Sequence, residues 1–189
     1  MILDELVDPD VCDEITDRWP VDGWKITDHD NCKGKRALNK LPLIPGPARS
    51  LILALNKEEN LERFSKIIGR TLLPDPFIVT RGELWGGGLH ETTTGGFLNV
   101  HVDFNRHPLG VYRRANLLIY LNDADGALML GSQVIHPKKG RGVLFETTES
   151  SWHGHPEPLK CASRKSIAIY YYSADGEDIP THSTVYLQV

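Results

Sequence analysis

Residues 95–105 read GGFLNVHVDFN, and this stretch decides the fold. Its apolar residues are typical of a strand, and His101 and Asp103 stand two positions apart within it. Alternate residues of a strand point to one face of a sheet, so this spacing predicts that both side chains project to the same side, joined there by Phe97 and Asn99. A lone His-x-Asp pair arises easily by chance, so a metal site needs a third ligand elsewhere in the chain.

The third ligand is expected in the segment WHGHP, residues 152–156. His153 would complete a set of two imidazoles and one carboxylate on one side of an ion, which leaves open positions opposite and suits Fe(II). The set contains no thiolate, which argues against structural zinc. His155 is the alternative, because it lies on the same face, but it precedes Pro156, which restricts its backbone and marks the end of the strand. The sequence therefore favours His153.

Arg164 begins a predicted strand beyond this segment and is a candidate for binding an acidic ligand. A guanidinium presents a bidentate fork to a carboxylate, and Ser166 adds a hydroxyl to the same oxygens. The alternative is that Arg164 is exposed and takes part in a surface ion pair. Alternation along the strand puts Arg164, Ser166, Ala168 and Tyr170 on one face and Lys165, Ile167 and Ile169 on the other.

The second half of the chain is rich in short apolar runs divided by Gly, Asn, Asp and Pro, which is typical of strands. Short strands that follow N-terminal helices predict a mainly β sandwich or barrel with helices packed outside. We expect a single domain over residues 1–189, with helical support in 1–76 and a β core in 77–189. The candidate strands are 77–80, 97–103, 115–121, 128–130, 133–136, 142–146, 151–155, 166–173 and 184–188.

Two helical regions are expected before this β-rich half. Asp8 and Pro9 form a helix start, and the helix is stopped by Pro20. The second region covers 47–73, with an interruption near Asn56 and an apolar stripe typical of core packing. Residues 21–46 show no clear period and are expected to form a solvated loop face. The alternative for its basic cluster, Lys33, Lys35 and Arg36, is an anion site.

The composition excludes several classes of protein. The chain has 189 residues, of which 40% are apolar and 24% charged, and a net charge of −4, so it is neither disordered nor basic enough for nucleic acid to be its main partner. Its three cysteines are odd in number and widely spaced, which argues against a disulfide framework. No stretch approaches the roughly 20 apolar residues of a membrane span. We therefore expect a soluble, unprocessed, cytoplasmic protein with no membrane partner.

Four segments, taken in order, resemble one known family. GGFLNVHVDFN, RRANLLIYLN, GRGVLFETTESSWHGHPEP and SRKSIAIYYYS are similar to the Fe(II)- and 2-oxoglutarate-dependent oxygenases, in particular the prolyl-hydroxylase-like branch, over residues 77–173. The resemblance implies a double-stranded β-helix, the jelly-roll or cupin-like core, with supporting N-terminal helices.

The resemblance also implies roles for individual residues. His101, Asp103 and His153 would be the iron ligands, and Arg164 would bind the distal carboxylate of 2-oxoglutarate. Tyr120 matches a family tyrosine that hydrogen-bonds the same carboxylate; the alternative for it is a half-buried strand aromatic. The remaining residues implied to line the co-substrate pocket are Asn116 and Leu118.

The implied reaction consumes 2-oxoglutarate and O2, with ascorbate as a possible supporting reductant, and releases succinate and CO2 while an unactivated C–H bond is hydroxylated. Asp103 favours hydroxylation over halogenation, because halogenating members of the family replace this carboxylate by a small residue. The expected substrate is a small molecule, an amino acid or a peptidyl side chain. The loop at residues 122–128 is shorter than in the prolyl-hydroxylase-like pattern, which leaves peptidyl specificity open.

Other interpretations remain open at this point. The first is a cupin-like metalloprotein, an isomerase or oxygen-sensing binder, that does not use 2-oxoglutarate; Arg164 argues for the oxygenase, because only the oxygenase needs a fixed cation near the metal. The second is a metal-free jelly-roll module that binds a ligand on Trp85, Trp152 and the loop 86–88. A basic rim favours an acidic substrate, although a solvated edge explains it nearly as well. This rim consists of Arg106, His107, Arg113 and Arg114. The sequence does not indicate an oligomeric state.

Overall fold

The long strand β4 (Gly88–Val102) organises the fold. A computed structural model describes residues 1–175 and 180–187. Before β4 come β1 (Ile2–Leu3), α1 (Pro9–Asp17), β2 (Lys25–His29), β3 (Cys32–Leu38), a 3-10 turn (Leu41–Leu43), α2 (Gly46–Leu55), α3 (Glu58–Ile68) and α4 (Pro76–Arg81). After it come β5 (Tyr112–Tyr120), β6 (Leu128–Leu130), β7 (Gln133–Ile135), β8 (Gly142–Glu146), β9 (His153–His155), β10 (Ser163–Ser173) and β11 (Val185–Tyr186).

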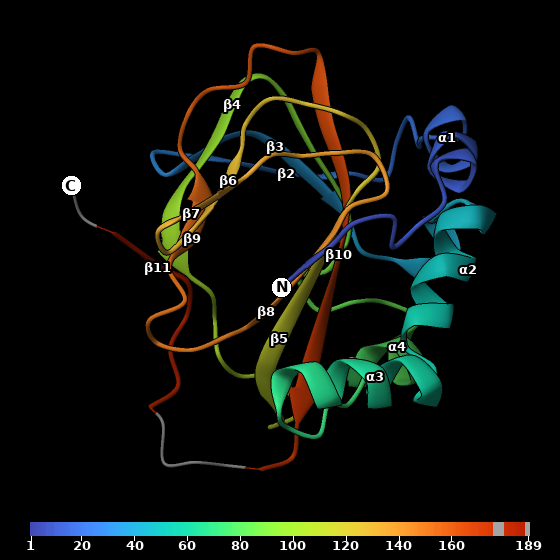
Figure 1. Cartoon of the computed structure of the whole chain (residues 1–189), viewed down its shortest axis with the longest axis vertical. Coiled ribbons are helices and arrows are strands. Elements are labelled where there is room, and N and C mark those ends of the chain that lie inside the picture. The colour runs from blue at the N-terminus through green and yellow to red at the C-terminus, as the bar shows by residue number, and fades with distance from the viewer. Residues whose placement is uncertain (176–179, 188–189) are drawn as a thin grey trace.

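The strands form one curled antiparallel sheet in the order β1-β8-β5-β10-β4-β9-β6-β7. The first part of β4 lies between β3 and β10, and its last residues pair with β9 and β11. Thus β4 belongs to both halves of the curled sheet. Figure 1 shows the helices on one side, beside β5 and β10, with β6, β7, β9 and β11 on the other. The mainly β architecture with N-terminal helices predicted from the sequence is confirmed.

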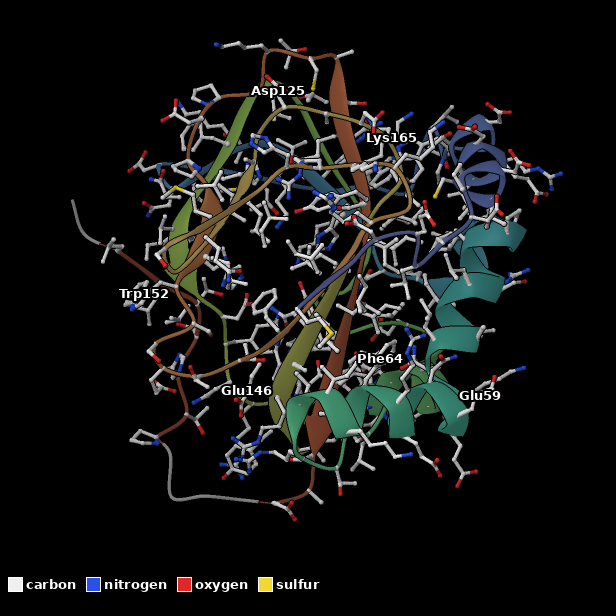
Figure 2. The ribbon with its side chains drawn as sticks, in the orientation of Figure 1. Glu59, Phe64, Asp125, Glu146, Trp152 and Lys165 are labelled. Carbon is white, nitrogen blue, oxygen red and sulfur yellow. The ribbon has the colours of Figure 1, made fainter. Side chains whose placement is uncertain are left out.

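The two faces of β10 separate the helix-packed core from the interior of the sheet. Ile167, Ile169 and Tyr171 belong to the main apolar core, whereas Ala168 and Tyr170 pack in a separate cluster on the other face. This is the alternation predicted from the sequence. Phe64 of α3 points to this core, with its ring 5.5 Å from that of Tyr171, and Glu59 points away from it (Figure 2). Burying one such aromatic side chain contributes about 1.5–3 kcal/mol.

The predicted strand at 77–80 is wrong, because these residues form the helix α4. Asp75 accepts a hydrogen bond from the backbone N–H of Phe77, Pro76 stands at the start of the helix, and Gly82 ends it with a φ of 64°. These end signals outweigh the strand preference of the Ile-Val-Thr run.

The predicted solvated loop at 21–46 is also wrong in part, because β2 and β3 form a hairpin that pairs with β4. Arg36 forms a half-buried ion pair with Glu91, and Lys35 lines a pocket inside the sheet. Only Lys33 of the basic cluster is exposed as expected. Pairing with β4 directs alternate residues of the cluster to the inside and the outside of the sheet. The sequence of this segment has no clear period, so it did not indicate this arrangement.

No helix in residues 1–175 or 180–187 combines the length and the apolar character needed to cross a bilayer.

Candidate metal centre

His101 and His153 are brought together by the pairing of β4 with β9, in which they face each other directly. The next pair is Leu98 with His155, so β4 contributes one residue more than β9 between the two pairs. This β-bulge turns both Leu98 and His101 toward the same pocket. The expectation that Phe97 and Asn99 would share the face of His101 is therefore wrong; the Asn99 amide donates to Asn31 instead.

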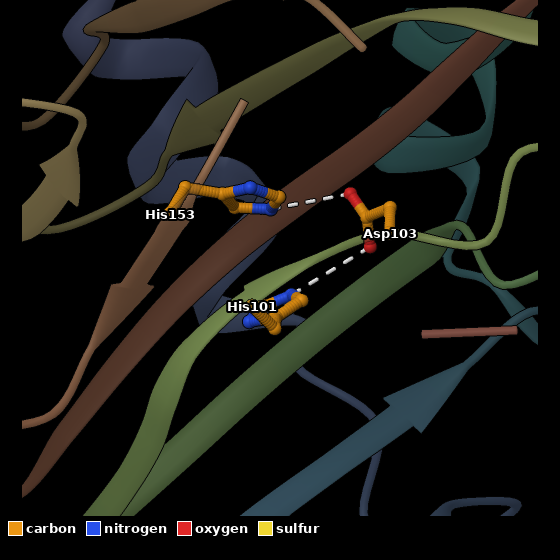
Figure 3. A group of neighbouring side chains, drawn as sticks. All are labelled: His101, Asp103 and His153. Atoms are coloured by element: carbon orange, nitrogen blue, oxygen red, sulfur yellow. Dashed lines mark ion pairs between the residues drawn. The ribbon is translucent and has the colours of Figure 1, made fainter. Parts of the chain in front are cut away.

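Three ligand atoms, one each from His101, Asp103 and His153, lie within 4.8 Å of one another. Asp103 follows the end of β4, and its carboxylate faces both imidazoles, with one oxygen directed to each (Figure 3). His101 Nε2 is 3.6 Å from Oδ1 of Asp103, and His153 Nε2 is 3.2 Å from Oδ2. The structure thus brings together the three residues that the sequence singled out as ligands.

The hydrogen bonds of both imidazoles prepare their Nε2 atoms for a cation. His101 Nδ1 lies 2.8 Å from the carbonyl oxygen of Asn99, and His153 Nδ1 lies 2.8 Å from that of Ser151. A carbonyl oxygen only accepts, so each Nδ1 donates, and a neutral ring then presents its Nε2 lone pair to the carboxylate. Burial lowers the pKa of His101, which favours the neutral form. Two lone pairs facing a carboxylate fit a metal cation between them.

Asp103 is itself held by Arg113 and Asn116. Its Oδ2 accepts a 2.7 Å hydrogen bond from each of them, and Arg113 Nε donates to the Asn116 Oδ1 at 2.8 Å. Burial alone would raise the pKa of Asp103, but the Arg113 guanidinium outweighs burial and holds this pKa well below its usual value. The carboxylate is therefore charged at neutral pH and fixed in one orientation.

Arg113 was missed as a site residue, because the sequence placed it in a basic rim. The rim is wrong for three of its four members: only Arg106 is exposed, and Arg113 is 2% exposed. A register shift in the pairing of β5 with β10 puts Arg113 on the side of Asn116, three positions on. No feature of the sequence predicts this register shift. The other two buried members are His107, beside Asp75, and Arg114, which donates to Ser173.

The three candidate ligands line a pocket inside the curled sheet, here called the inner pocket, together with residues of β3, β4, β5, β9 and β10. Arg164 enters this pocket and donates from Nη2 to the Tyr120 hydroxyl at 3.3 Å, and its buried Nε has no hydrogen-bond partner in the described chain. Tyr120 is fully buried behind it. The remaining residues that the sequence assigned to this pocket, Asn116, Leu118 and Ser166, also line it.

His155 lines the inner pocket as well, but it does not belong to the ligand cluster of the described residues. Burial, together with the charges of Arg164 and Lys35, lowers its pKa to about 2. Its buried Nδ1 has no partner in the described part of the chain. His155 is thus a neutral polar group of the pocket wall.

Two further cavities lie near the centre. A polar one of about 260 Å³, here called the outer cavity, reaches Asp103 and Arg113 and is also lined by Thr147 and Glu149. A mainly apolar one of about 490 Å³ lies beside Trp85, Gly86 and Phe104. Trp152 does not line this apolar cavity and points outward (Figure 2). The two tryptophans therefore do not form the joint stacking surface that the metal-free interpretation needs.

The comparisons with known proteins agree with this geometry. Residues 87–172 match the family model described as "2OG-Fe(II) oxygenase superfamily". No curated protein sequence matches the chain.

Several solved structures share the fold at low sequence identity. HygX from Streptomyces hygroscopicus, with nickel and 2-oxoglutarate bound, has a TM-score of 0.64 at 14% identity over 92% of this chain and 82% of that chain; another structure of HygX also contains hygromycin B. A prolyl-4-hydroxylase from Pseudomonas putida has a TM-score of 0.63 at 14% identity over 91% of both chains. A prolyl hydroxylase from Trichoplax adhaerens, in complex with a hypoxia inducible factor peptide, has a TM-score of 0.63 at 16% identity over 91% of this chain and 82% of that chain. The predicted double-stranded β-helix core is thereby confirmed.

Proposed function

We propose, from the match of residues 87–172 to the 2OG-Fe(II) oxygenase superfamily, that the chain is an Fe(II)- and 2-oxoglutarate-dependent dioxygenase that hydroxylates an unactivated C–H bond. The observation that carries the proposal is the convergence of His101, Asp103 and His153. Two imidazole nitrogens and one carboxylate suit ferrous iron and leave room for further ligands. When bound, Fe(II) would supply the activation of O2, with 2-oxoglutarate as the reductant that takes up one oxygen atom and leaves as succinate and CO2.

The chain's own residues have the task of placing the reactants. Arg113 and Asn116 keep Asp103 charged and oriented before any ligand arrives. Arg164 offers a buried guanidinium with an unpartnered Nε to the distal carboxylate of 2-oxoglutarate, and Tyr120 and Ser166 add hydroxyls. The apolar side chain of Leu118 in the same pocket helps to keep water away from the co-substrate.

The primary substrate is proposed to bind in the outer cavity, because this cavity reaches Asp103 from outside the inner pocket. Two buried donors there, Nη1 of Arg113 and Oγ1 of Thr147, have no hydrogen-bond partner in the described residues. They suit a polar acceptor on the substrate, such as a carbonyl, hydroxyl or carboxylate oxygen. Structural neighbours contain a peptide or hygromycin B, so a small molecule, an amino acid and a peptidyl side chain all remain within the proposed class.

The test is an anaerobic titration of the purified protein with Fe(II) and 2-oxoglutarate, followed by the visible charge-transfer band of the chelate. The wild type should give the band, Asp103→Ala should not, and Arg164→Ala should require a much higher 2-oxoglutarate concentration. Lys165→Ala is the matched control, because Lys165 is the neighbour of Arg164 on the opposite face of β10, over the Trp19 ring. A wild type without the band would overturn the proposal and favour the cupin-like alternative, which uses the same ligands without 2-oxoglutarate.

A substrate screen by succinate release would follow. Hydroxylated product must be identified by mass for each hit, since succinate alone also reports uncoupled turnover. Addition of ascorbate tests whether it supports repeated turnover.

A further inference from the structure

Lys35, Thr92 and Arg164 lie side by side on three neighbouring strands. Thr92 of β4 pairs with Lys35 of β3 on one side and with Arg164 of β10 on the other. Directly paired residues of a sheet point to the same face, and adjacent strands are about 4.8 Å apart, so the two backbones are separated by roughly 10 Å. Both side chains line the inner pocket. Each is long enough to reach an anion placed above Thr92.

Lys35 points inward because the hairpin approaches β4 very closely at Gly34. Gly34 has a φ of 62°, and a Cβ at this position would lie 3.0 Å from the Cα of Gly96. The register between β3 and β4 shifts here, from Lys33 opposite Phe97 to Lys35 opposite Thr92. As a result Lys33 remains exposed while Lys35 is half-buried in the pocket.

The ammonium group of Lys35 makes no hydrogen bond or ion pair with any described residue, in contrast to Arg36, which binds Glu91. Burial lowers the pKa of Lys35, with Arg164 among the groups that add to this effect and Asp103 among those that oppose it. A lysine turned into a protein interior without a counter-ion is unfavourable, and such groups are ordinarily paired. The partner is therefore expected to be a ligand.

The charges of the inner pocket indicate what this ligand is. Arg113 neutralises Asp103, and burial keeps His90 neutral by lowering its pKa to about 3. Two cations remain without a carboxylate partner among the described residues, Arg164 and Lys35. Two uncompensated positive charges on neighbouring strands fit an anionic group, such as a carboxylate, placed between them.

We propose that Lys35 is a second cation of the co-substrate site and binds the distal carboxylate of 2-oxoglutarate together with Arg164. The inference rests on the proposed function and adds a residue from the N-terminal hairpin, outside the residues matched by the family model. Lys35 and Arg164 both pair with Thr92. Asn116, which donates a hydrogen bond to Asp103, pairs instead with Tyr170, further along β10. This places Lys35 at the Arg164 end of the pocket.

The test compares Lys35→Met with the wild type by calorimetric titration of the Mn(II)-loaded protein with two ligands. Methionine keeps the apolar stem and removes the charge. The affinity for 2-oxoglutarate should fall about 10- to 100-fold, as expected for loss of one charged hydrogen-bond partner. The affinity for 2-oxopentanoate, which lacks the distal carboxylate, should stay within about 3-fold. Lys33→Met, the exposed neighbour on the same hairpin, should leave both affinities unchanged, and Lys35→Arg should retain most of the affinity for 2-oxoglutarate.

A second readout needs no ligand. Because the unpartnered ammonium costs free energy in the metal-free protein, Lys35→Met should raise its melting temperature by about 2–4 °C, while a merely structural lysine would lower it. Unchanged binding of 2-oxoglutarate, an equal loss for both ligands, or a lower melting temperature would each overturn the inference. A wild type that binds no 2-oxoglutarate would instead overturn the proposed function, so the two failures are distinguishable.

Discussion

Removing the Arg113 guanidinium is the most direct way to test how the metal centre is built. Arg113→Met leaves a side chain of similar length in the same buried space and deletes the 2.7 Å contact with Asp103 Oδ2 and the 2.8 Å contact with Asn116. Asp103 is then a buried carboxylate that keeps only the Asn116 amide on this oxygen. We expect a higher pKa for Asp103, a weaker metal site and a less stable fold.

The magnitude follows from the burial of the pair. The exposed fractions of the two side chains are 1% and 11%. Two unit charges about 4 Å apart attract each other by about 4 kcal/mol at an effective dielectric constant of 20. Breaking a buried pair by removing one partner costs about 3–5 kcal/mol, because the remaining charge is left uncompensated. We therefore expect the free energy of unfolding of the metal-free variant to fall by about 3–5 kcal/mol.

Urea denaturation of the metal-free protein at neutral pH measures this loss. The weaker metal site is measured as a lower affinity of Arg113→Met for Mn(II). Arg114→Met is the matched control, because it removes the neighbouring buried arginine, which contacts Ser173 and not Asp103. It should leave the affinity for Mn(II) unchanged. In an Asp103→Asn background, Arg113→Met should cost at least about 2 kcal/mol less than in the wild type. A loss below about 1 kcal/mol, the value of an exposed ion pair, would refute the reasoning.

Three further predictions concern other parts of the molecule. Tyr120→Phe, which removes the hydroxyl contacted by Arg164, should weaken the binding of 2-oxoglutarate by about 3- to 10-fold in a direct titration. Gly88→Ala should destabilise the fold by about 3 kcal/mol or more in urea denaturation, because Gly88 has a φ of 107° and an added Cβ would collide with the Leu38 carbonyl oxygen. Burial opposes protonation of His182, but Ser183 and Glu149 outweigh burial and raise the pKa of His182 above 6.5. The protonated His182 therefore stabilises the fold below pH 6.5, and this stabilisation is lost as the pH rises through the raised pKa of the folded state. Hydrogen exchange of residues 180–187, corrected for intrinsic rates, should accordingly be faster at pH 8 than at pH 6 and lose this dependence in His182→Gln.

The candidate metal centre was predictable because strand alternation and chain order are properties of the sequence. The strand β8 has the predicted bounds, and the alternation along β10 correctly predicted the inward direction of Arg164 and Ser166. His101 and Asp103 were expected on one side of a strand, and the structure brings them together, although Asp103 lies just beyond β4.

The errors arise where alternation breaks. The bulge between Leu98 and His101 and the register shift at Arg113 place residues three apart on one side, so a period of two assigns their neighbours wrongly. The inward direction of Lys35 depends on the pairing of β3 with β4. This pairing joins segments far apart in the sequence, so no local pattern predicts it. The helix α4 was misassigned for a different reason: the prediction followed the β-branched run at 78–80, whereas the end signals at Asp75 and Gly82 determine the structure.

Because β4 belongs to both halves of the sheet, it carries residues of both proposed binding places, and ligand binding there can be followed through the stability of the fold. The same strand carries Thr92, between the two cations, and His101, at the proposed iron site. A compound that binds only the folded protein at either place raises its free energy of unfolding, by about 2.7 kcal/mol at a hundred times its Kd. Melting curves can therefore detect the binding of a metal ion or of a 2-oxoglutarate analogue before any turnover assay exists.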